Sequence, residues 1–572
     1  MADERETKEA PATSRAAPAS PDARAALFIL LLIALLVAKR LAYHLTYLVG
    51  DPFALATFSD GQLYEEAARD ILAHPPFGAQ PFYLQGLFAY LLALPLALAD
   101  QVVIGLLLQL VLAAGALWLF HRTAVAMFGA VAGGLSSAVL LAYHELAFYE
   151  NKYLSVSLGV CCNVVALWAA CRALRQPRPR AWLGAGAAAG LAALGRPNLI
   201  VAAPFSALAG VLARRGEHQR AAPVVALFAL GVLLALAPMA LRNQIAIGRP
   251  DVFPSHSGGI PFFIGNNPAA NGRWNTAGDL LSGQVGRERI ELAAHLGIRA
   301  QDPAELDRAV GAAMRERALR FIREQPFSWL GLELRKLWLT LGNHRFVRDY
   351  DVRGEAELIG AWHAWGLPFG VLLALGVLGL GVLLRRARET RAERALLVGV
   401  VLVLGGQLCA VLAANLLVFT SAQNRLPLCV PLAFAAGPGL LALHARLRRR
   451  ERSAWQVSVP VMVVAAVLLL QAFVPRSPRS DRPTSVHYYN LAAVEDAIGR
   501  LDAAAEHYGR AAERNPKQPM FHFSQARALR RLGRGPEAEA ALRRLEALSA
   551  ISDALRDAVS EERRLLRAGD RR

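Results

Sequence analysis

The sequence predicts an all-α protein, in which a polytopic bundle of about eleven membrane crossings precedes a soluble C-terminal domain of tetratricopeptide-like helical repeats. The chain has 572 residues, of which 55% are hydrophobic, and it contains many apolar runs near the roughly 20 residues that span a bilayer. Arginine clusters follow several of these runs. After Arg482 the composition becomes charged, and small and aromatic residues recur at the 34-residue period of tetratricopeptide repeats.

The first 24 residues mix Ala, Pro, Glu and Arg without hydrophobic periodicity, which predicts a disordered cytoplasmic tail. The apolar run 25–49 is too long for the core of a signal peptide and lacks a convincing cleavage site after it, so we expect it to remain as the first membrane helix. The net charge of +18 comes largely from arginine clusters between apolar runs. Membrane orientation explains such clusters better than nucleic-acid binding does.

Four arginine clusters set the expected topology, because basic residues near membrane helices favour the cytoplasmic side. They comprise Arg172, Arg175, Arg178 and Arg180; Arg214, Arg215 and Arg220; Arg385, Arg386, Arg388, Arg391 and Arg394; and Arg446, Arg448, Arg449, Arg450 and Arg452. Run 153–171 therefore descends from an outer loop at 144–152. Runs 123–141 and 102–120 precede it and meet at a cytoplasmic turn at His121 and Arg122. Asp60 then lies outside, and run 82–98 lies along the outer face without crossing.

The remaining apolar runs continue this alternation. Runs 182–195 and 199–213 form either a hairpin around residues 196–198 or one kinked helix, and the hairpin is favoured because it keeps both flanking arginine clusters inside. Run 222–241 rises to a long outer region, 242–361. Runs 367–384, 395–419, 428–444 and 457–474 follow and leave the C-terminal domain outside. Stretch 321–341 is amphipathic, which favours an interfacial helix over direct ligand contact.

The domains expected are thus the tail 1–24, the membrane domain 25–474 with outer loops 50–101 and 242–361, and the repeat domain 475–572. The first repeat copy is indicated by Tyr488, Leu491, Ala492, Gly499, Ala504, Tyr508, Ala511 and Pro516. The second copy is indicated by His522, Ala526, Gly533, Ala538, Leu542 and Leu545, and a helix over 551–566 is expected to cap the array. Such a domain either binds a protein partner or stabilises the chain.

Polar residues near the apolar runs gather on the outer face in this topology. They are Asp60, Glu145, Glu150, Lys152, Arg196, Arg242, Asn243, Asn266, Asn267 and Arg425. Ionisable groups next to a membrane are expensive and commonly mark a ligand path. Lys39 and Arg40 either join this set or extend along the first helix to the outer surface.

At these positions the chain resembles the GT-C glycosyltransferases, in the branch of the protein O-mannosyltransferases and the lipid A aminoarabinose transferases. The resemblance covers about residues 25–474. It rests on Asp60 with Tyr64 and Ala68, the apolar hairpin 75–98, Glu150, Arg196 with Pro197 and Asn198, Arg242 with Asn243, Gly265 to Pro268, and Asn424 to Pro427.

The resemblance implies an inverting transfer of a sugar from a polyprenyl-phosphate donor to an acceptor outside the cytoplasm. Asp60 is the implied general base, and Glu150 either assists it or pairs with Lys152 at the end of the loop. Cationic groups would hold the lipid phosphate, in the order Arg425, Arg196 and Arg242, with Lys152 as a further candidate. An ordinary salt bridge is the alternative for each arginine. The remaining candidates, for substrate binding, are Tyr64, Asn198, Asn243, Asn266 and Asn267.

One departure from the family concerns metal binding. Many relatives carry a second acid directly after the first, whereas Gly61 follows Asp60 here and Glu65 and Glu66 come about one turn later. No metal ligand is therefore assigned, and a divalent metal remains an open alternative.

Other functions stay open at this stage: an O-antigen ligase or polymerase acting on a lipid-diphosphate donor, a lipid transporter or flippase, and a membrane scaffold that presents the repeats. The expected location is a bacterial-type inner membrane, and the expected partners are the lipid-linked donor, membrane lipid and a protein bound by the repeats. The sequence names neither the sugar nor the acceptor.

Overall fold

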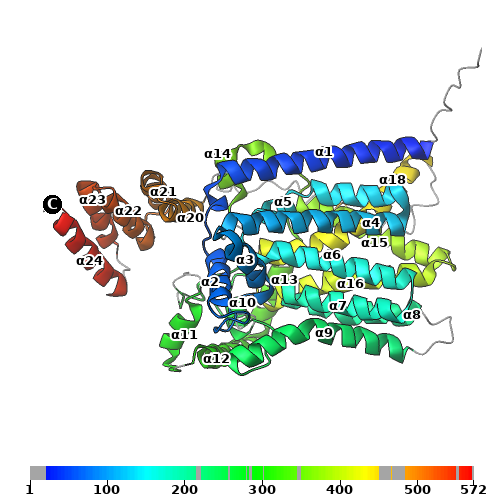
Figure 1. Cartoon of the computed structure of the whole chain (residues 1–572), viewed down its shortest axis with the longest axis horizontal. Helices are drawn as coiled ribbons and strands as arrows, with labels where there is room; N and C mark the ends of the chain where they lie inside the picture. The colour runs from blue at the N-terminus through cyan, green and yellow to red at the C-terminus, as the bar shows by residue number, and fades with distance from the viewer. Residues whose placement is uncertain are drawn as a thin grey trace, which may run out of the picture.

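The computed structural model describes residues 21–213, 221–254, 258–278, 280–281, 286–300, 302–343, 349–449, 466, 484–548 and 553–569. Within these residues all regular secondary structure is helical, as predicted. Long helices lie side by side in a bundle, shorter helices gather at one end of it, and the C-terminal helices extend beyond that end (Figure 1).

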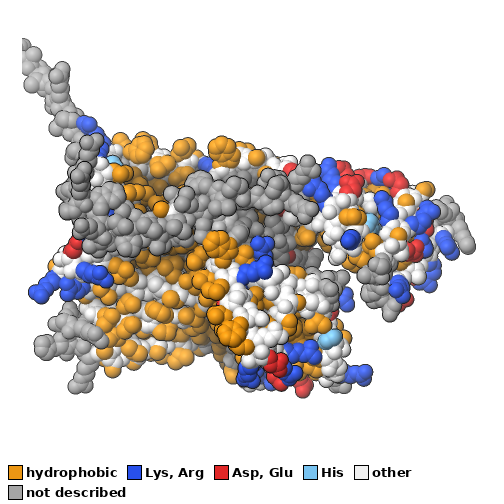
Figure 2. Space-filling view, turned by 180° about the vertical axis from the view of Figure 1, so that it is seen from behind, with side chains coloured by type: hydrophobic (Ala, Val, Ile, Leu, Met, Phe, Trp, Pro, Cys, Tyr) orange, Lys and Arg blue, Asp and Glu red, His pale blue; other side chains and the backbone are white. Residues whose placement is uncertain are grey.

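Seven helical segments in the described residues are long and apolar enough to cross a membrane. They belong to α1 (Pro21–Gly50), α4 (Val102–Ala142), α6 (Ser155–Arg175), α9 (Ala222–Ile247), α15 (Phe369–Glu389), α16 (Arg394–Leu417) and the segment 422–448 with α17 (Ala422–Arg425), η5 (Leu426–Leu428) and α18 (Cys429–Arg449). On the face seen in Figure 2, hydrophobic side chains predominate along the described part of the bundle, whereas charged side chains gather at its ends and on the C-terminal domain. The chain is therefore an integral membrane protein.

Helix α4 reverses direction in its middle. Gly129 has φ +83°, outside the helical region. Beyond it the chain returns along the first arm, since Nδ1 of His121 lies 2.9 Å from Oγ of Ser137. The turn predicted at His121 and Arg122 is therefore wrong, and both residues lie inside the first arm. Glycine adopts a positive φ without a steric penalty, which explains why the reversal occurs at Gly129.

Helices α7 (Pro179–Gly195) and α8 (Ala203–Ala213) form the hairpin that the sequence favoured. They meet at Arg196 and are joined by the short helix η2 (Pro197–Ala202). Helix α9 packs against both α7 and α8. The last predicted crossing, 457–474, lies outside the described residues apart from position 466, so the total of about eleven stays a prediction.

The segment 50–101, which the sequence predicts to be an outer loop, contains η1 (Pro52–Ala54), α2 (Asp60–Ala73) and α3 (Gly86–Ala99), and α5 (His144–Glu150) follows the α4 hairpin. The region 242–361 contains α10 (Gly259–Gly265), α11 (Glu288–Leu296), α12 (Pro303–Glu324), α13 (Pro326–Leu341) and α14 (Val352–Ile359), followed by η4 (Ala361–Ala364). The amphipathic stretch 321–341 is thus divided at Pro326. The apolar side chains of α13 at Phe327, Leu330, Leu334 and Trp338 are exposed, which fits an interfacial helix.

The C-terminal domain contains two helix pairs and a final helix. The first pair is α20 (Ser485–Ala497) and α21 (Leu501–Arg514), the second is α22 (Pro519–Arg531) and α23 (Gly535–Glu546), and α24 (Asp553–Gly569) packs on the second. Each pair turns at a glycine of positive φ, Gly499 and Gly533. These glycines are 34 residues apart, as the sequence period requires. Their assignment as tetratricopeptide repeats stays a prediction.

Candidate functional site

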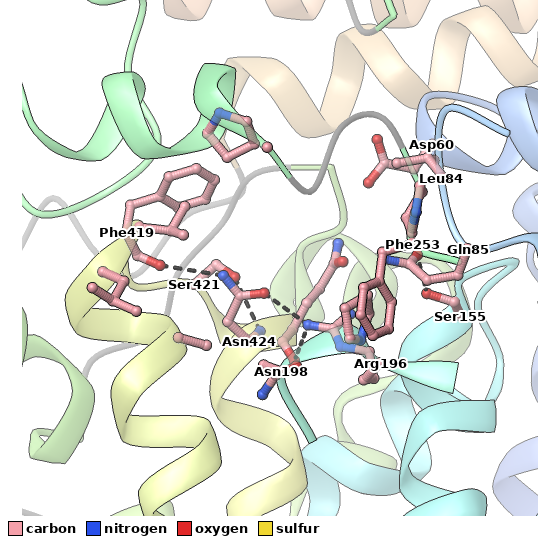
Figure 3. A pocket seen from close by; sticks show the side chains of 18 of the residues that line it. Asp60, Leu84, Gln85, Ser155, Arg196, Asn198, Phe253, Phe419, Ser421 and Asn424 are labelled. Carbon is pink, nitrogen blue, oxygen red and sulfur yellow. Dashed lines mark hydrogen bonds between the residues drawn. The ribbon is translucent and has the colours of Figure 1, made fainter. Parts of the chain in front are cut away.

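A cavity of about 590 Å³ opens where the first turn of α2 faces the start of η2 and the end of α16. Four residues predicted for the site line it: Asp60, Tyr64, Arg196 and Asn198. Figure 3 shows Asp60 on one wall and Arg196 on another, with Asn198 and Asn424 beside the arginine. The fold therefore brings together part of the constellation expected from the sequence.

Asp60 is the first residue of α2, and an unusual turn before it sets the direction of its Cα–Cβ bond. Ser59 has φ +54° and ψ −132°, and the backbone N–H of Gly61 donates to the carbonyl of Phe58 at 3.0 Å. These angles match the second residue of a type II′ turn, a position that glycine usually occupies. Holding serine there costs about 1–3 kcal/mol. The hydroxyl of Ser59 offsets part of this cost by donating to Oδ1 of Asp349 at 2.8 Å.

A polar cluster lies one turn further along α2. The hydroxyl of Tyr64 lies within hydrogen-bond distance of Oε1 of Gln85 and 2.8 Å from Oγ of Ser155. Burial raises the pKa of Tyr64 above its usual value, and the nearby charge of Asp60 raises it further, while the hydrogen bond with Ser155 opposes both effects. The phenol therefore stays protonated. This cluster offers the cavity neutral hydroxyl and amide groups of the kind that bind sugar hydroxyls.

Arg196 is buried, and its neighbours explain its direction. Its side-chain carbons pack against Gly159 of α6, where a Cβ atom would lie 2.3 Å from Cγ of the arginine. Nη2 donates to Oδ1 of Asn424 at 2.7 Å and to the carbonyl of Gln423 at 3.4 Å. Both acceptors are neutral, and within the described part of the chain the guanidinium forms no salt bridge. Asp60 also acts on this charge electrostatically, but a buried cation whose hydrogen-bond acceptors are all neutral is expensive, so this wall of the cavity favours an anion.

The wall around α16 and η2 is apolar. Ala410, Ala413, Ala414 and Leu417 contribute from α16, and Ile200 and Val201 from η2. Leu417 and Val201 are 60% and 39% exposed. The cavity is therefore bordered by exposed apolar side chains.

Glu150 and Lys152 do not line this cavity. Glu150 lies 2.6 Å from Nη2 of Arg40 and 3.4 Å from Nε2 of His44. Lys152 pairs instead with Glu355 of α14, and its ammonium lies 3.9 Å from the ring centre of Tyr47. The expected pairing of Glu150 with Lys152 is thus wrong, because α1 and α14 supply each with its own partner. Arg40 is also buried, so it does not extend to the surface.

Arg425, the first of the expected phosphate ligands, forms contacts outside this cavity. Its Nη2 lies 3.2 Å from Oε1 of Glu145, its Nη1 donates to the carbonyl of Gly342 at 2.8 Å, and its guanidinium lies 4.2 Å from the ring centre of Phe369. Arg242 donates to the carbonyls of Phe77 and Gln80 and to Oδ1 of Asn243. Both arginines bind carbonyl groups of neighbouring loops and line no part of this cavity.

The three remaining asparagines satisfy backbone groups. Asn243 donates to the carbonyl of Asp251 and borders a second cavity. Asn266 donates to the carbonyls of Phe262 and Leu417 and accepts from Lys336 at 3.0 Å. Asn267 donates to the carbonyls of Phe263 and Ile264 and caps the turn that follows. These contacts indicate that Asn266 and Asn267 hold the 259–277 segment in place.

Sequence reasoning missed several residues that line the cavity from other segments. Tyr83 and Glu288 are joined by a hydrogen bond of 2.9 Å, and Asp349 and Tyr350 approach from the end of the outer region. Phe253 and Ser421 contribute as well. Glu288 begins α11 and Asp349 lies in a loop, and neither belongs to a recognised motif, so the sequence gives no signal that they line the same cavity as Asp60. Ser421 lies only three residues before Asn424, so its closeness to the Asn424 to Pro427 motif is a signal in the sequence that it lies near the site.

The described residues hold no group of three or more His, Cys, Asp or Glu side chains placed to bind one metal ion. Asp60, Glu288 and Asp349 line the same cavity but do not form such a group. No step below is assigned to a metal.

The fold and the site together define a polytopic membrane protein with a cavity that combines an aspartate, a buried arginine and an apolar wall. Residues 78–241 match a family model described as dolichyl-phosphate-mannose-protein mannosyltransferase. This segment includes the hairpin of α7 and α8 and the buried Arg196. The match supports the expectation of a membrane glycosyltransferase that uses a lipid-phosphate sugar.

Solved structures of the oligosaccharyltransferase of Archaeoglobus fulgidus are also similar to the chain. The apo form has 14% identity and a TM-score of 0.40, and the two cover 85% of this chain and 59% of that one. A form with an inhibitory peptide and a dolichol-phosphate has 11% identity and a TM-score of 0.39, with 84% and 59% covered. The chain thus spans just under three fifths of the length of those proteins. No curated protein matches the chain significantly.

Proposed function

We propose that this protein transfers a sugar from a polyprenyl-phosphate donor to a hydroxyl of an acceptor outside the cytoplasm, with inversion at the anomeric carbon. The observation that carries the proposal is the cavity itself. It combines a carboxylate on the first turn of α2, a buried guanidinium that forms no salt bridge among the described residues, and an apolar wall. These three groups match the acceptor hydroxyl, the phosphate and the lipid of such a reaction.

Asp60 acts as the general base in this proposal. The acceptor oxygen attacks the anomeric carbon while its proton passes to the carboxylate of Asp60. The bond between the anomeric carbon and the phosphate oxygen breaks, and its electron pair leaves with the polyprenyl phosphate. One displacement inverts the configuration. The turn at Ser59 fixes where the carboxylate points, so the base does not have to be ordered during the reaction.

Arg196 binds the phosphate and stabilises the charge that develops on it. The hydrogen bonds to Asn424 and Gln423 hold the guanidinium in place while they leave its charge unneutralised. A charge-assisted hydrogen bond in a water-poor site is worth about twice a neutral one. This assignment puts Arg196 ahead of Arg425, whose charge is already balanced by Glu145.

The lipid part of the donor lies along the apolar wall. Ala410, Ala413 and Ala414 are spaced for one face of α16, and they leave room beside Ile200 and Val201. The polyprenyl chain leaves the cavity past Leu417 and enters the bilayer, so that the phosphate stays beside Arg196. The neutral cluster of Tyr64, Gln85 and Ser155 then faces the sugar.

The test is transfer of a labelled sugar by the purified full-length protein. The matched family description makes polyprenyl-phosphate mannose the first donor to try, with polyprenyl-phosphate glucose as the second. We expect Asp60→Asn to lower the transfer rate at least about a hundredfold, the usual range for loss of a general base. Donor affinity should change little. Arg196→Gln should instead weaken donor binding at least about tenfold.

Glu66→Gln is the matched control, because Glu66 is an exposed acid of the same helix that does not line this cavity. Its transfer rate should equal that of the wild type. Undiminished transfer by Asp60→Asn would remove Asp60 from the mechanism. Lipid movement without sugar transfer, measured in proteoliposomes, would replace the transferase proposal by a flippase.

A further inference from the structure

A second cavity, of about 410 Å³, adjoins the first. Its walls are the end of α9, the loop that follows it, the start of α3 and one face of α12. Phe253, Pro254 and Gly258 line both cavities. A molecule bound in the second cavity therefore borders the first cavity, which Asp60 lines.

Three arginines line this second cavity: Arg249, Arg308 and Arg315. Arg308 and Arg315 are seven residues apart on α12, so they lie on one face about 10 Å apart along its axis. Gly311 and Ala312 between them add little side-chain volume, which leaves the floor of the cavity open. Neither Arg308 nor Arg315 has an ion pair or hydrogen bond to another side chain in the described ranges. Nη2 of Arg249 is 3.9 Å from Asp302.

Two buried polar atoms on residues of this cavity have no hydrogen-bond partner among the described residues. One is Oδ1 of Asp307, whose residue is 8% exposed and whose other oxygen lies 3.3 Å from Arg289. The other is Nη1 of Arg249. Buried polar atoms are nearly always hydrogen-bonded, so both indicate a missing ligand or water. A carboxylate oxygen accepts from a hydroxyl, whereas a guanidinium donates to an anion.

We propose that this cavity is a binding subsite for the acceptor, and that the acceptor is a saccharide carrying a phosphate or carboxylate group. The acid group lies between Arg308 and Arg315, with Arg249 as a further donor, and a hydroxyl of the saccharide donates to Oδ1 of Asp307. The attacking hydroxyl then extends past Phe253 to Asp60. This inference rests on the proposed transfer reaction for the role of the ligand, but the binding itself does not require that reaction.

Binding is measured first, without a donor. The probes are fluorescently labelled maltotetraose and the same saccharide with a terminal phosphate monoester, titrated into the full-length protein in phosphatidylcholine nanodiscs. We expect the phosphorylated probe to bind at least about tenfold more tightly than the neutral one, since two charge-assisted contacts are added. The double variant Arg308→Gln/Arg315→Gln should remove this difference. Ala312→Trp fills the floor of the cavity and should weaken the binding of both probes.

The matched control is Arg317→Gln/Arg320→Gln, which removes the same charge from the opposite face of α12. It should retain the preference for phosphate. Equal affinity of the wild type for the two probes would overturn the proposal, as would an equal loss in the control variant. A bilayer phosphate is the other source of the same chemistry. A preference for phosphatidylglycerol nanodiscs that depends on Arg308 and Arg315, with no saccharide binding, would assign the cavity to a lipid headgroup and overturn the acceptor proposal.

The failure of this inference can be told apart from failure of the transfer reaction. Asp60→Asn should bind the phosphorylated probe as the wild type does, because Asp60 does not line the second cavity. If the wild type transfers sugar but shows no preference for phosphate, only the subsite is wrong. If the phosphorylated probe binds but no donor is consumed, only the reaction is wrong.

Discussion

The hydroxyl of Ser59 donates a hydrogen bond of 2.8 Å to Oδ1 of Asp349, which lies 290 residues further along the chain. The backbone carbonyl of the same aspartate accepts from Nδ2 of Asn490 at 2.8 Å. One residue therefore joins the turn that aims Asp60 to the first helix of the C-terminal domain. This relationship leads to the first two predictions.

Ser59 itself is the first position to change. Ser59→Ala loses the hydrogen bond and keeps the strained backbone, so it should lower the free energy of unfolding by about 1–2 kcal/mol. Ser59→Gly loses the same hydrogen bond but relieves the positive φ, and it should cost less. Thermal unfolding of the purified protein checks the order. An alanine variant as stable as the glycine variant would contradict the strained turn.

The C-terminal domain should be needed for full activity because α20 packs on residues that reach the cavity. A Cβ atom at Gly354 would lie 2.1 Å from the ring of His487, so Gly354→Ala should push α20 away from α14. We expect sugar transfer to fall about tenfold or less, since only the positioning of Asp60 is affected. The comparison variant is Gly184→Ala, where a Cβ atom meets nothing within 4 Å. Hydrogen exchange of α20 should rise in Gly354→Ala alone.

Docking of α20 should also depend on pH. Burial lowers the pKa of His487 from 6.5 to about 4, although the carboxylates of Asp351, Glu357 and Glu355 oppose this shift, and His507 lowers it further. The undocked state therefore takes up a proton first as the pH falls. The stability contributed by neutral His487 is fully present above pH 6.5, and it is lost between about pH 6.5 and pH 4.

This pH effect is measured by hydrogen exchange of α20 at pH 7 and pH 4.5, where exchange should be faster at the lower pH. His487→Gln cannot be protonated in this range and should flatten the dependence. His522→Gln, within the second helix pair, should leave the response of α20 unchanged. An equal pH response in the wild type and His487→Gln would show that another group is responsible.

Glu150 should behave as a structural residue. It is 3% exposed and pairs with Arg40, which is also buried, so Glu150→Gln leaves a buried arginine without this counter-charge. The expected loss is about 3–5 kcal/mol of stability. The double variant Arg40→Gln/Glu150→Gln should recover most of it, as measured by thermal unfolding. If Glu150→Gln folded normally and lost only transfer activity, the result would support a catalytic role for Glu150 instead.

Arg425 is expected to be structural for the same reason. Arg425→Gln leaves Glu145 without its cation, and it should lower the folded yield and the unfolding temperature. The affinity of the folded fraction for the donor should match that of the wild type, in contrast to Arg196→Gln. Donor titration of both variants in the same nanodiscs separates the two roles. Reduced donor affinity in well-folded Arg425→Gln would restore it as a phosphate ligand.

Much of the fold could be predicted because it depends on local patterns. Membrane helices are predicted by apolar runs of sufficient length, and their orientation by arginine clusters at their ends. A helical repeat domain is predicted by the 34-residue spacing. The predicted position of the reversal in α4 lies N-terminal to the observed one. Polar His121 and Arg122 suggested a turn, but the chain reverses at Gly129, which adopts a positive φ. Motifs in order along the chain singled out Asp60, Tyr64, Arg196 and Asn198, and the structure places all four around one cavity, while their roles stay predictions.

The residue pattern alone predicts a helical membrane protein with polar residues gathered near one end of its bundle. Which charges remain available there depends on how the helices pack. Arg425 and Lys152 meet Glu145 and Glu355, and Arg196 meets only neutral acceptors. Those pairings join segments up to 280 residues apart, and the hydropathy of either segment carries no information about its partner. The burial of a charge and its neutralisation depend on how distant segments pack together. The choice between Arg196 and Arg425 as the candidate phosphate ligand therefore required the tertiary structure.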